Sequence, residues 1–322
     1  MRNKKLDNAK WILTLLMVLY HIQFVGDEKY SFSFLMIKNF GDCVVPAFAI
    51  ISGFLFWSTV RNFDDLKGKY KRRIYSLLFP YALWNLINTL FVNWQVGKRG
   101  VSLLDLNIWR NIIMWDSSPH FWYLFMLMFW TVLSPILYLL YNKKEGRLVL
   151  LLLSGAYLFY KGDLILHSRF IYILYTWAGM IGFCYPDLLN EFCFEGKKRR
   201  TVIYIALTIY LGIYFIYCVQ PLGMGVKVWL YAIRAVALLI TLFNFPFAKI
   251  GVATNYKYSF WIYAVHYWLD NSLGGIISAY ISNAHIYQIV TWGTVTAIGL
   301  TIGIIVSHTL SKVFKLLTGS RG

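Results

Sequence analysis

Long apolar stretches alternate with short polar segments along the whole chain. Because a hydrocarbon layer of about 30 Å needs roughly 20 mostly apolar residues per helix, these stretches predict membrane-spanning helices. Strands of a membrane barrel are excluded, since they alternate apolar and polar positions over about ten residues. We expect an all-α polytopic membrane protein with about ten transmembrane helices, forming a single domain over residues 1–322. The ten ranges are 11–26, 40–60, 74–95, 120–141, 148–161, 169–186, 201–218, 226–245, 258–280 and 286–310.

The composition agrees with this pattern and narrows the classes of partner. The chain is 59% hydrophobic and only 14% charged, which argues against an ordinary water-soluble domain. Its formal charge of +17 would suggest nucleic acid in a soluble protein, but few solvated faces are expected here. We therefore expect the lipid bilayer, and no nucleic acid, as a partner. The 4 cysteines are widely spaced without a CxxC pair, so neither a zinc site nor a disulfide framework is indicated.

The basic residues also predict an orientation. Cytoplasmic loops of membrane proteins are enriched in Lys and Arg. With ten spans and a cytoplasmic N-terminus, 22 of the 31 basic side chains fall on the cytoplasmic side and 8 on the opposite side, with Arg234 inside a span. Both termini are therefore predicted to be cytoplasmic.

Two ionisable residues bracket the first span. Lys10 and His21 are eleven positions apart, so on a helix they point within about 20° of the same direction and lie about 16 Å apart along the axis. They are predicted to line one stripe, with Lys10 at the cytoplasmic surface and His21 in the membrane. The simpler alternative makes Lys10 an interfacial anchor and His21 a histidine satisfied between helices.

A dense cation cluster precedes the third span. It includes Lys71, Arg72 and Arg73, and the sequence alone predicts that it lies at a helix start. One interpretation is a topology signal that contacts lipid headgroups. The other is phosphate capture by the Arg side chains together with the amides of the helix start.

Other polar residues stand in or beside the predicted spans. A span residue that can ionise usually faces a protein or water-filled interior. Arg234 needs an anionic partner, and Asp270 follows His266 by one helical turn, where it could orient that imidazole. The simpler alternative for Trp122 and Tyr123 is that they belong to the interfacial aromatic belt. For Ser52 the simpler alternative is that it allows close helix packing. These further candidates are Asp42, Ser52, His120, Trp122, Tyr123, Arg234, His266 and Asp270.

Five segments together resemble the acyltransferase-3 family of integral membrane acyltransferases. The opening Asp, basic residue and His are Asp7, Lys10 and His21, and a Ser-Gly-Phe signature ends at Phe54. A basic run before Pro-Tyr, a His-x-Trp-aromatic-Leu segment and a Ser-aromatic-x-Ile-Tyr-x-x-His segment follow in the expected order at 70–81, 120–124 and 259–266. Two departures are Lys10 in place of the commoner Arg and the missing Gly after it.

The resemblance implies an acyl-coenzyme A donor, with acetyl as the expected group, and a carbohydrate acceptor in the cell envelope. It implies that Lys10, Lys71, Arg72 and Arg73 bind the donor, while His21 and His266 are catalytic. His21 is expected to be the general base or an acyl carrier. Asp42, His120 and Trp122 would face the acceptor, and Ser52, Tyr123, Arg234 and Asp270 would support them. No metal and no permanently bound cofactor are expected, and the expected location is the bacterial plasma membrane.

A transporter or exporter of a polysaccharide or lipid-linked sugar is the competing class, because spans with interior charges also suit transport. An inverted repeat in the hydropathy would favour it, and none is visible. A purely structural subunit would not need intramembrane His, Arg and Asp. Gly299 and Gly303 permit close helix packing, either within the chain or between protomers of a homo-oligomer.

Overall fold

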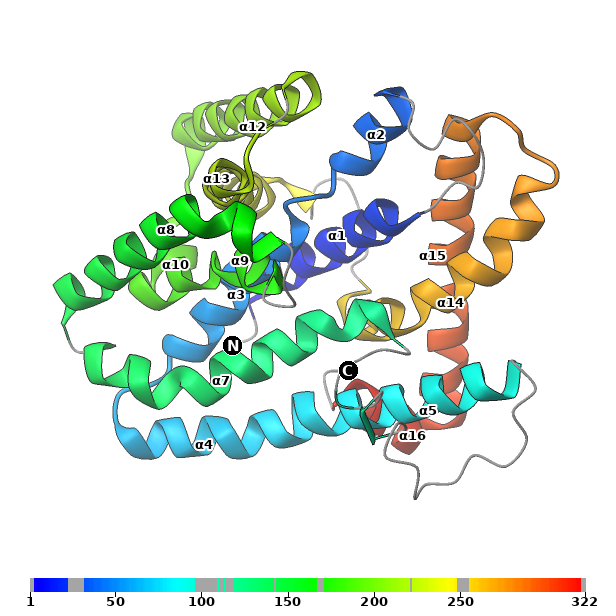
Figure 1. The fold of residues 1–322 in the computed structure, drawn as a ribbon, viewed down its shortest axis with the longest axis horizontal. Coiled ribbons are helices and arrows are strands. Elements are labelled where there is room, and N and C mark those ends of the chain that lie inside the picture. The colour runs from blue at the N-terminus through cyan, green and yellow to red at the C-terminus, as the bar shows by residue number, and fades with distance from the viewer. Residues whose placement is uncertain are drawn as a thin grey trace.

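The fold is described by a computed structural model of the chain. It describes residues 3–22, 32–95, 109–110, 113, 118–141, 143–166, 171–220, 222–247 and 255–319. All regular elements in these ranges are helices (Figure 1). The all-α class is therefore confirmed for the described part of the chain.

The described residues form the following helices in chain order. They are α1 (Lys4–His21), α2 (Phe32–Asn39), α3 (Val44–Trp57), α4 (Phe63–Arg73), the π-helical turn η2 (Ile74–Leu78), α5 (Phe79–Gln95), the 3₁₀ turn η3 (Pro119–Phe121), α7 (Trp122–Tyr141), α8 (Lys144–Leu166), α9 (Ile171–Thr176), α10 (Gly179–Cys184), α11 (Leu188–Glu191), α12 (Gly196–Val219), α13 (Met224–Asn244), the 3₁₀ turn η5 (Tyr256–Tyr258), α14 (Ser259–Ser278), α15 (Ala284–Thr309) and α16 (Ser311–Thr318).

Six segments of the described residues are long and apolar enough to cross a membrane. They are Met36–Trp57, Phe63–Phe91, Pro119–Leu140, Gly196–Val219, Met224–Asn244 and Ala284–Thr309. The protein is therefore a multi-pass membrane protein.

The remaining predicted spans coincide with helices that are shorter or more polar. These helices are α1, α8 and α14, together with the shorter apolar segment Tyr172–Cys184. Residues 23–26 of the first predicted span and 169–170 of the sixth lie outside the described residues. The count of about ten, and the orientation of the termini, stay predictions.

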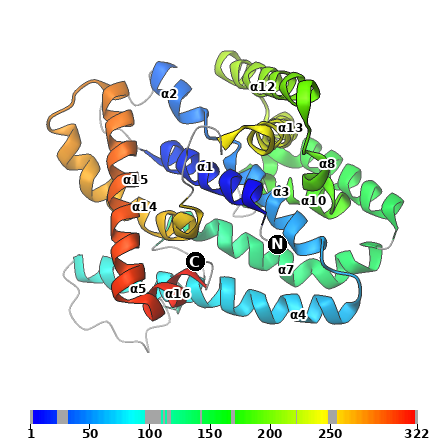
Figure 2. The same cartoon turned by 180° about the vertical axis from the view of Figure 1, so that it is seen from behind.

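Helix α1 lies at the centre of the bundle (Figure 1). It packs against α3, α13, α14 and α15, while α12 lies at the periphery against α13. Viewed from behind, α15 crosses close to α14 and α16 at one edge (Figure 2). A central α1 means that its inward stripe is surrounded by protein on several sides.

Small residues allow α3 to approach α10 closely. A Cβ atom at Gly53 would collide with the backbone carbonyl of Gly179, and one at Gly182 would collide with the backbone of Phe54 and Ile50. The Ser-Gly step of the second predicted span therefore permits the helix contact that small residues commonly make in membranes.

Gly299 and Gly303 pack α15 against α14 within the chain. A Cβ atom at Gly303 would lie 2.8 Å from the Trp261 ring, and the Trp261 Nε1–H donates to the carbonyl of Gly299 at 3.1 Å. Both glycines of this pair are thus used inside the protomer.

The cation cluster does not lie at a helix start, contrary to the prediction. Helix α4 begins ten residues earlier than Arg73, at Phe63, where Asn62 and Asp65 form a capping box. The chain then continues through η2 into α5 without a break, as Figure 1 shows along the lower edge. The backbone amides near Arg72 and Arg73 donate hydrogen bonds within the helix. Only the side chains of these two residues can therefore bind an anion. A π-helical turn directly after the cluster is a feature often found at functional sites.

Candidate functional site

A cavity of about 830 Å³ lies between α1, α3, α7 and the junctions of α4 with η2 and of η5 with α14. Its lining combines basic, imidazole and aromatic side chains. Of the residues predicted from the sequence, it brings together Lys10, His21, Ser52, Arg72, Arg73, His120, Trp122 and Tyr123. These residues are spread over more than a hundred positions of the chain, from Lys10 to Tyr123, so the cavity is created by the tertiary fold.

One face of α1 forms a continuous wall of this cavity. Asp7, Lys10, Thr14, Met17 and His21 all line it, at helical spacings of three and four residues. Lys10 and His21 therefore lie on one face of the helix, as predicted, while their positions relative to the membrane stay predictions. Because the helix rises 1.5 Å per residue, the two side chains mark levels about 16 Å apart within a single cavity.

Four cationic side chains line the cavity: Lys10, Arg72, Arg73 and Lys257. The Arg72 Nε–H donates to the carbonyl of Gly68 at 3.2 Å, and the Arg73 guanidinium lies 5.4 Å from the centre of the Phe56 ring. These contacts orient the two side chains while leaving other N–H groups for a ligand. Lys71 directly precedes Arg72 on α4; it is exposed and does not line the cavity.

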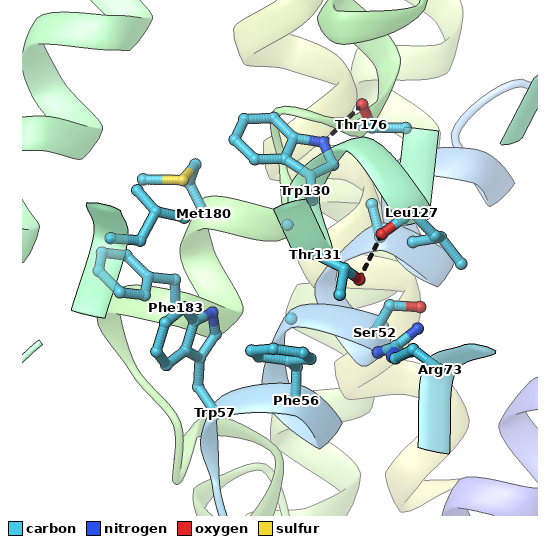
Figure 3. Close-up of a pocket in the computed structure, with 14 residues that line it drawn as sticks. Ser52, Phe56, Trp57, Arg73, Leu127, Trp130, Thr131, Thr176, Met180 and Phe183 are labelled. Carbon is cyan, nitrogen blue, oxygen red and sulfur yellow. Dashed lines mark hydrogen bonds between the residues drawn. The ribbon is translucent and has the colours of Figure 1, made fainter. Parts of the chain in front are cut away.

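A pocket of about 50 Å³ adjoins the large cavity and shares Ser52, Arg73 and Leu127 with it. Figure 3 shows Arg73 and Phe56 at this pocket, with apolar and aromatic side chains opposite them. Two hydrogen bonds brace its wall on α7, from Trp130 Nε1 to Thr176 at 3.0 Å and from Thr131 to the carbonyl of Leu127 at 2.7 Å (Figure 3). The basic part of the large cavity therefore ends against a rigid, largely apolar wall.

The histidine end of the cavity contains His21 and His120. The Nδ1–H of His21 donates to the carbonyl of Met17 at 2.8 Å, since a carbonyl can only accept. This bond fixes the proton on Nδ1 and leaves the Nε2 lone pair. A neutral imidazole in this tautomer can act as a base or a nucleophile at Nε2.

His266 lies behind these two imidazoles rather than on the cavity surface. Its ring centre is 5.1 Å from that of His21 and 5.2 Å from that of His120, and the residue is buried. Its Nδ1–H donates to the carbonyl of Tyr263 at 2.7 Å, and its buried Nε2 has no hydrogen-bond partner. His266 therefore connects His21 and His120 at van der Waals distance from both.

His120 is held from two sides by α14. Its Nε2–H donates to the carbonyl of Ala264 at 3.2 Å, and the Tyr263 hydroxyl donates to the backbone carbonyl of His120 at 2.6 Å. The ring also stacks on Tyr267 at 5.5 Å between centres. The two histidine-containing segments, near the start of α7 and on α14, are thus joined directly.

Aromatic residues line the side of the cavity between its cations and its histidines. The Tyr123 hydroxyl is 3.1 Å from the Ser52 hydroxyl, which joins α7 to α3. Trp122 stacks on Tyr172 of α9 with 4.5 Å between ring centres. In an interfacial belt, Trp122 and Tyr123 would face lipid. Their contacts with other helices instead support a role in shaping the cavity.

Three predicted site residues lie elsewhere. Asp42 and Arg234 form an ion pair with each other, and neither lines the large cavity. Asp270 is buried beside Tyr287 of α15, and the imidazole of His266 is oriented by the Tyr263 carbonyl instead. The helix face shared by His266 and Asp270 therefore does not bring the carboxylate to this site.

Some cavity residues were not singled out from the sequence as site residues. Lys257 entered the sequence analysis only as one of the 22 basic residues assigned to the cytoplasmic side, although it stands two positions before the segment that begins at Ser259. Tyr263 and Ser259 belong to that segment, and both line the cavity. Ser259 and Tyr263 could have been predicted as site residues because they lie inside the segment 259–266, which resembles a motif of the family.

The arrangement suits binding of a long anionic molecule that reaches a pair of imidazoles. In the described part of the chain, no group of three or more His, Cys, Asp or Glu residues has the geometry of a metal site. The cavity offers cationic donors from Lys10, Arg72, Arg73 and Lys257, together with the Nε2 lone pair of the neutral His21 imidazole.

The chain was compared with known proteins. The family model described as "Acyltransferase domain", Acyl_transf_3, matches residues 3–310. No curated protein and no solved structure matches the chain. The matched range includes every residue that lines the large cavity except Gly319. The chain therefore belongs to the Acyl_transf_3 family of acyltransferases.

Proposed function

We propose that the protein transfers an acetyl group from acetyl-coenzyme A to a hydroxyl of a cell-envelope carbohydrate. The observation that supports this most directly is the single cavity that joins Lys10, Arg72 and Arg73 to His21. Cations are suited to the phosphates of coenzyme A, with the guanidinium groups offering paired donors. The flexible arm of the donor would follow the α1 stripe toward His21.

In this mechanism the Nε2 atom of His21 removes the proton of the acceptor hydroxyl. The hydroxyl oxygen forms a bond to the acyl carbon, the bond from that carbon to sulfur breaks, and the proton passes to the sulfur so that coenzyme A leaves as the thiol. General-base assistance of this kind typically contributes about 10² to 10⁴ in rate.

An acyl-histidine route uses the same atoms. There, Nε2 forms a bond to the acyl carbon while the carbon–sulfur bond breaks and coenzyme A leaves as the thiolate. In a second step the acceptor hydroxyl oxygen bonds to the acyl carbon, the bond from that carbon to Nε2 breaks, and the hydroxyl proton passes to the thiolate. His266 serves as a positioning residue in both routes, because it contacts the His21 ring without lining the cavity. Retention of label on the protein before an acceptor is added would distinguish the acyl-histidine route.

The experiment is incubation of purified protein with radiolabelled acetyl-coenzyme A, measuring loss of the thioester and transfer of label to added envelope glycan. His21→Ala is expected to lower the rate by about 10² or more. The control is His308→Ala, an exposed histidine at the end of α15. Full activity of His21→Ala would contradict the proposal, and a protein that moves glycan without consuming the thioester would be a transporter. The plasma-membrane location and the cytoplasmic termini are proposed together with this function.

A further inference from the structure

A second polar cavity of about 320 Å³ lies at the end of the bundle where α12 ends and α13 begins. It is lined by Asn39, Asp42, Tyr217, Cys218, Val219, Gln220, Lys227 and Tyr231. We refer to it as the Lys227 cavity. Its polar lining contrasts with the groove of about 330 Å³ between α12 and α13 farther along the same helices, which is lined by apolar and Trp side chains. A polar hollow in a membrane protein is costly unless a polar ligand or water uses it.

The charge of Asp42 is already neutralised within the protein. Arg234 pairs with the Asp42 carboxylate and also donates to the carbonyls of Asn39 and Phe40, both at 3.2 Å. The rings of Tyr210 and Tyr214 cover the guanidinium, with its central carbon 4.5 Å and 5.0 Å from their centres. Asp42 is the only carboxylate among the described residues that line the cavity.

Lys227 supplies the charge that remains. It is half-buried at the start of α13, and the described residues contain no ion pair to its ammonium group. Its backbone is fixed, because the Tyr217 hydroxyl donates to the Lys227 carbonyl at 2.9 Å. The lining of the cavity therefore combines this cation with the amide side chains of Asn39 and Gln220.

Aromatic rings extend from this cavity to the large one. Tyr217 and Tyr231 stack with 5.1 Å between ring centres and 18° between planes. Tyr231 is 5.9 Å from Tyr175, and Tyr175 is 6.1 Å from Trp122, which lines the large cavity. Faces of such rings with hydroxyl groups at their edges suit sugars, which present both C–H and O–H groups.

We propose that the Lys227 cavity binds an acidic saccharide, with Lys227 pairing with a sugar carboxylate and Tyr217 and Tyr231 contacting the ring. The site would select the acceptor, and the proposal rests on the proposed function for that role. The row of contacting rings from Tyr231 through Tyr175 to Trp122 links the lining of the Lys227 cavity to that of the large cavity.

The test compares methyl β-D-glucuronide with methyl β-D-glucoside as ligands of the purified, detergent-solubilised protein, using ligand-observed NMR titration. The wild type is expected to bind the glucuronide about tenfold or more tightly, because a hydrogen bond to a charged group contributes more than one between neutral groups. Lys227→Gln should remove this preference and Lys227→Arg should retain it. Lys161→Gln is the matched control, since Lys161 is on α8 outside the cavity.

The proposal is overturned if the wild type shows no preference or if Lys227→Gln keeps it. It is also overturned if glycerol 3-phosphate binds in a Lys227-dependent way while the glucuronide does not, because the cavity would then be a lipid-headgroup site. Tyr231→Leu should weaken both sugars without changing their ratio.

Failure of this proposal can be distinguished from failure of the proposed function by measuring acetyl-coenzyme A consumption in the same preparations. His21→Ala should abolish consumption and leave the glucuronide preference intact. If consumption does not depend on His21 but the preference depends on Lys227, the acyl-transfer mechanism fails and the saccharide site stands.

Discussion

The cation end of the large cavity and the Asp42–Arg234 pair show two different uses of charge in one bundle. Arg234 has an exposed fraction of 0% and is surrounded by a carboxylate, two carbonyls and two tyrosine rings. Arg72 and Arg73 instead border an 830 Å³ cavity, with Arg72 exposed. The first charge is neutralised within the protein, and the second faces open space, as the proposed donor site requires. An ionisable residue in an apolar segment therefore indicates ligand binding only when its contacts within the protein leave open space beside the charged group.

The largest expected effect that tests this comparison is a loss of folding stability on removal of the Arg234 guanidinium. Arg234→Met should destabilise the protein by about 3–5 kcal/mol, because it leaves the Asp42 carboxylate buried without its partner. Thermal unfolding in detergent would measure this. Lys257→Met, on the exposed rim of the large cavity, should change stability by no more than about 0.5 kcal/mol. Equal losses in both variants would mean that the two regions use charge in the same way.

The same pair offers a further check. The double variant Asp42→Leu with Arg234→Met should recover most of the lost stability, since replacing a buried ion pair with apolar residues is often neutral. A double variant as unstable as Arg234→Met alone would show that the carboxylate left behind is not the cause of the loss.

The second effect concerns the donor. Replacing Arg72 and Arg73 together with Gln should raise the KM for acetyl-coenzyme A about tenfold or more and leave kcat less changed, as charged hydrogen bonds contribute about 1.5–3 kcal/mol. Steady-state kinetics would measure this, with Arg200→Gln on the exposed start of α12 as the control. An unchanged KM in an intact, correctly inserted protein would assign these residues to topology alone.

The smallest effect tests the close helix contact behind the cavity. Gly53→Ala should destabilise the protein by about 1–3 kcal/mol, because the added methyl group meets the Gly179 carbonyl. Gly212→Ala is the matched control, since nothing lies within 4 Å of the added Cβ atom there. Thermal unfolding should separate the two variants, and equal behaviour would refute the α3–α10 contact.

Helical periodicity was sufficient to predict the α1 stripe. Lys10 and His21 line one cavity because eleven residues nearly complete three turns, a local property of the helix. The candidates Arg72, Arg73 and His120 came from a dense cation cluster and from a polar residue beside a predicted span, and their convergence depends on tertiary contacts that no local pattern contains.

Contacts between distant segments account for what sequence reasoning did not find. Arg234 was known to need an anion, but its partner is 192 positions away, at Asp42. The predicted helix start at the cation cluster was wrong, because the capping box at Asn62 and the π-helical turn keep residues 63–95 in one helical segment. A carboxylate one turn after His266 was a fair local hypothesis, but the backbone carbonyl of Tyr263 accepts the hydrogen bond from the imidazole Nδ1–H instead.

The most direct test of the central claim, that the large cavity is the donor site, is protection of a cysteine by coenzyme A. Ser52→Cys, in a variant lacking the four native cysteines, places a thiol on the cavity, and Ser278→Cys at the end of α14 places one away from it. Saturating coenzyme A should slow maleimide labelling of Ser52→Cys about tenfold and leave Ser278→Cys unchanged. Equal labelling of Ser52→Cys with and without coenzyme A would contradict the account.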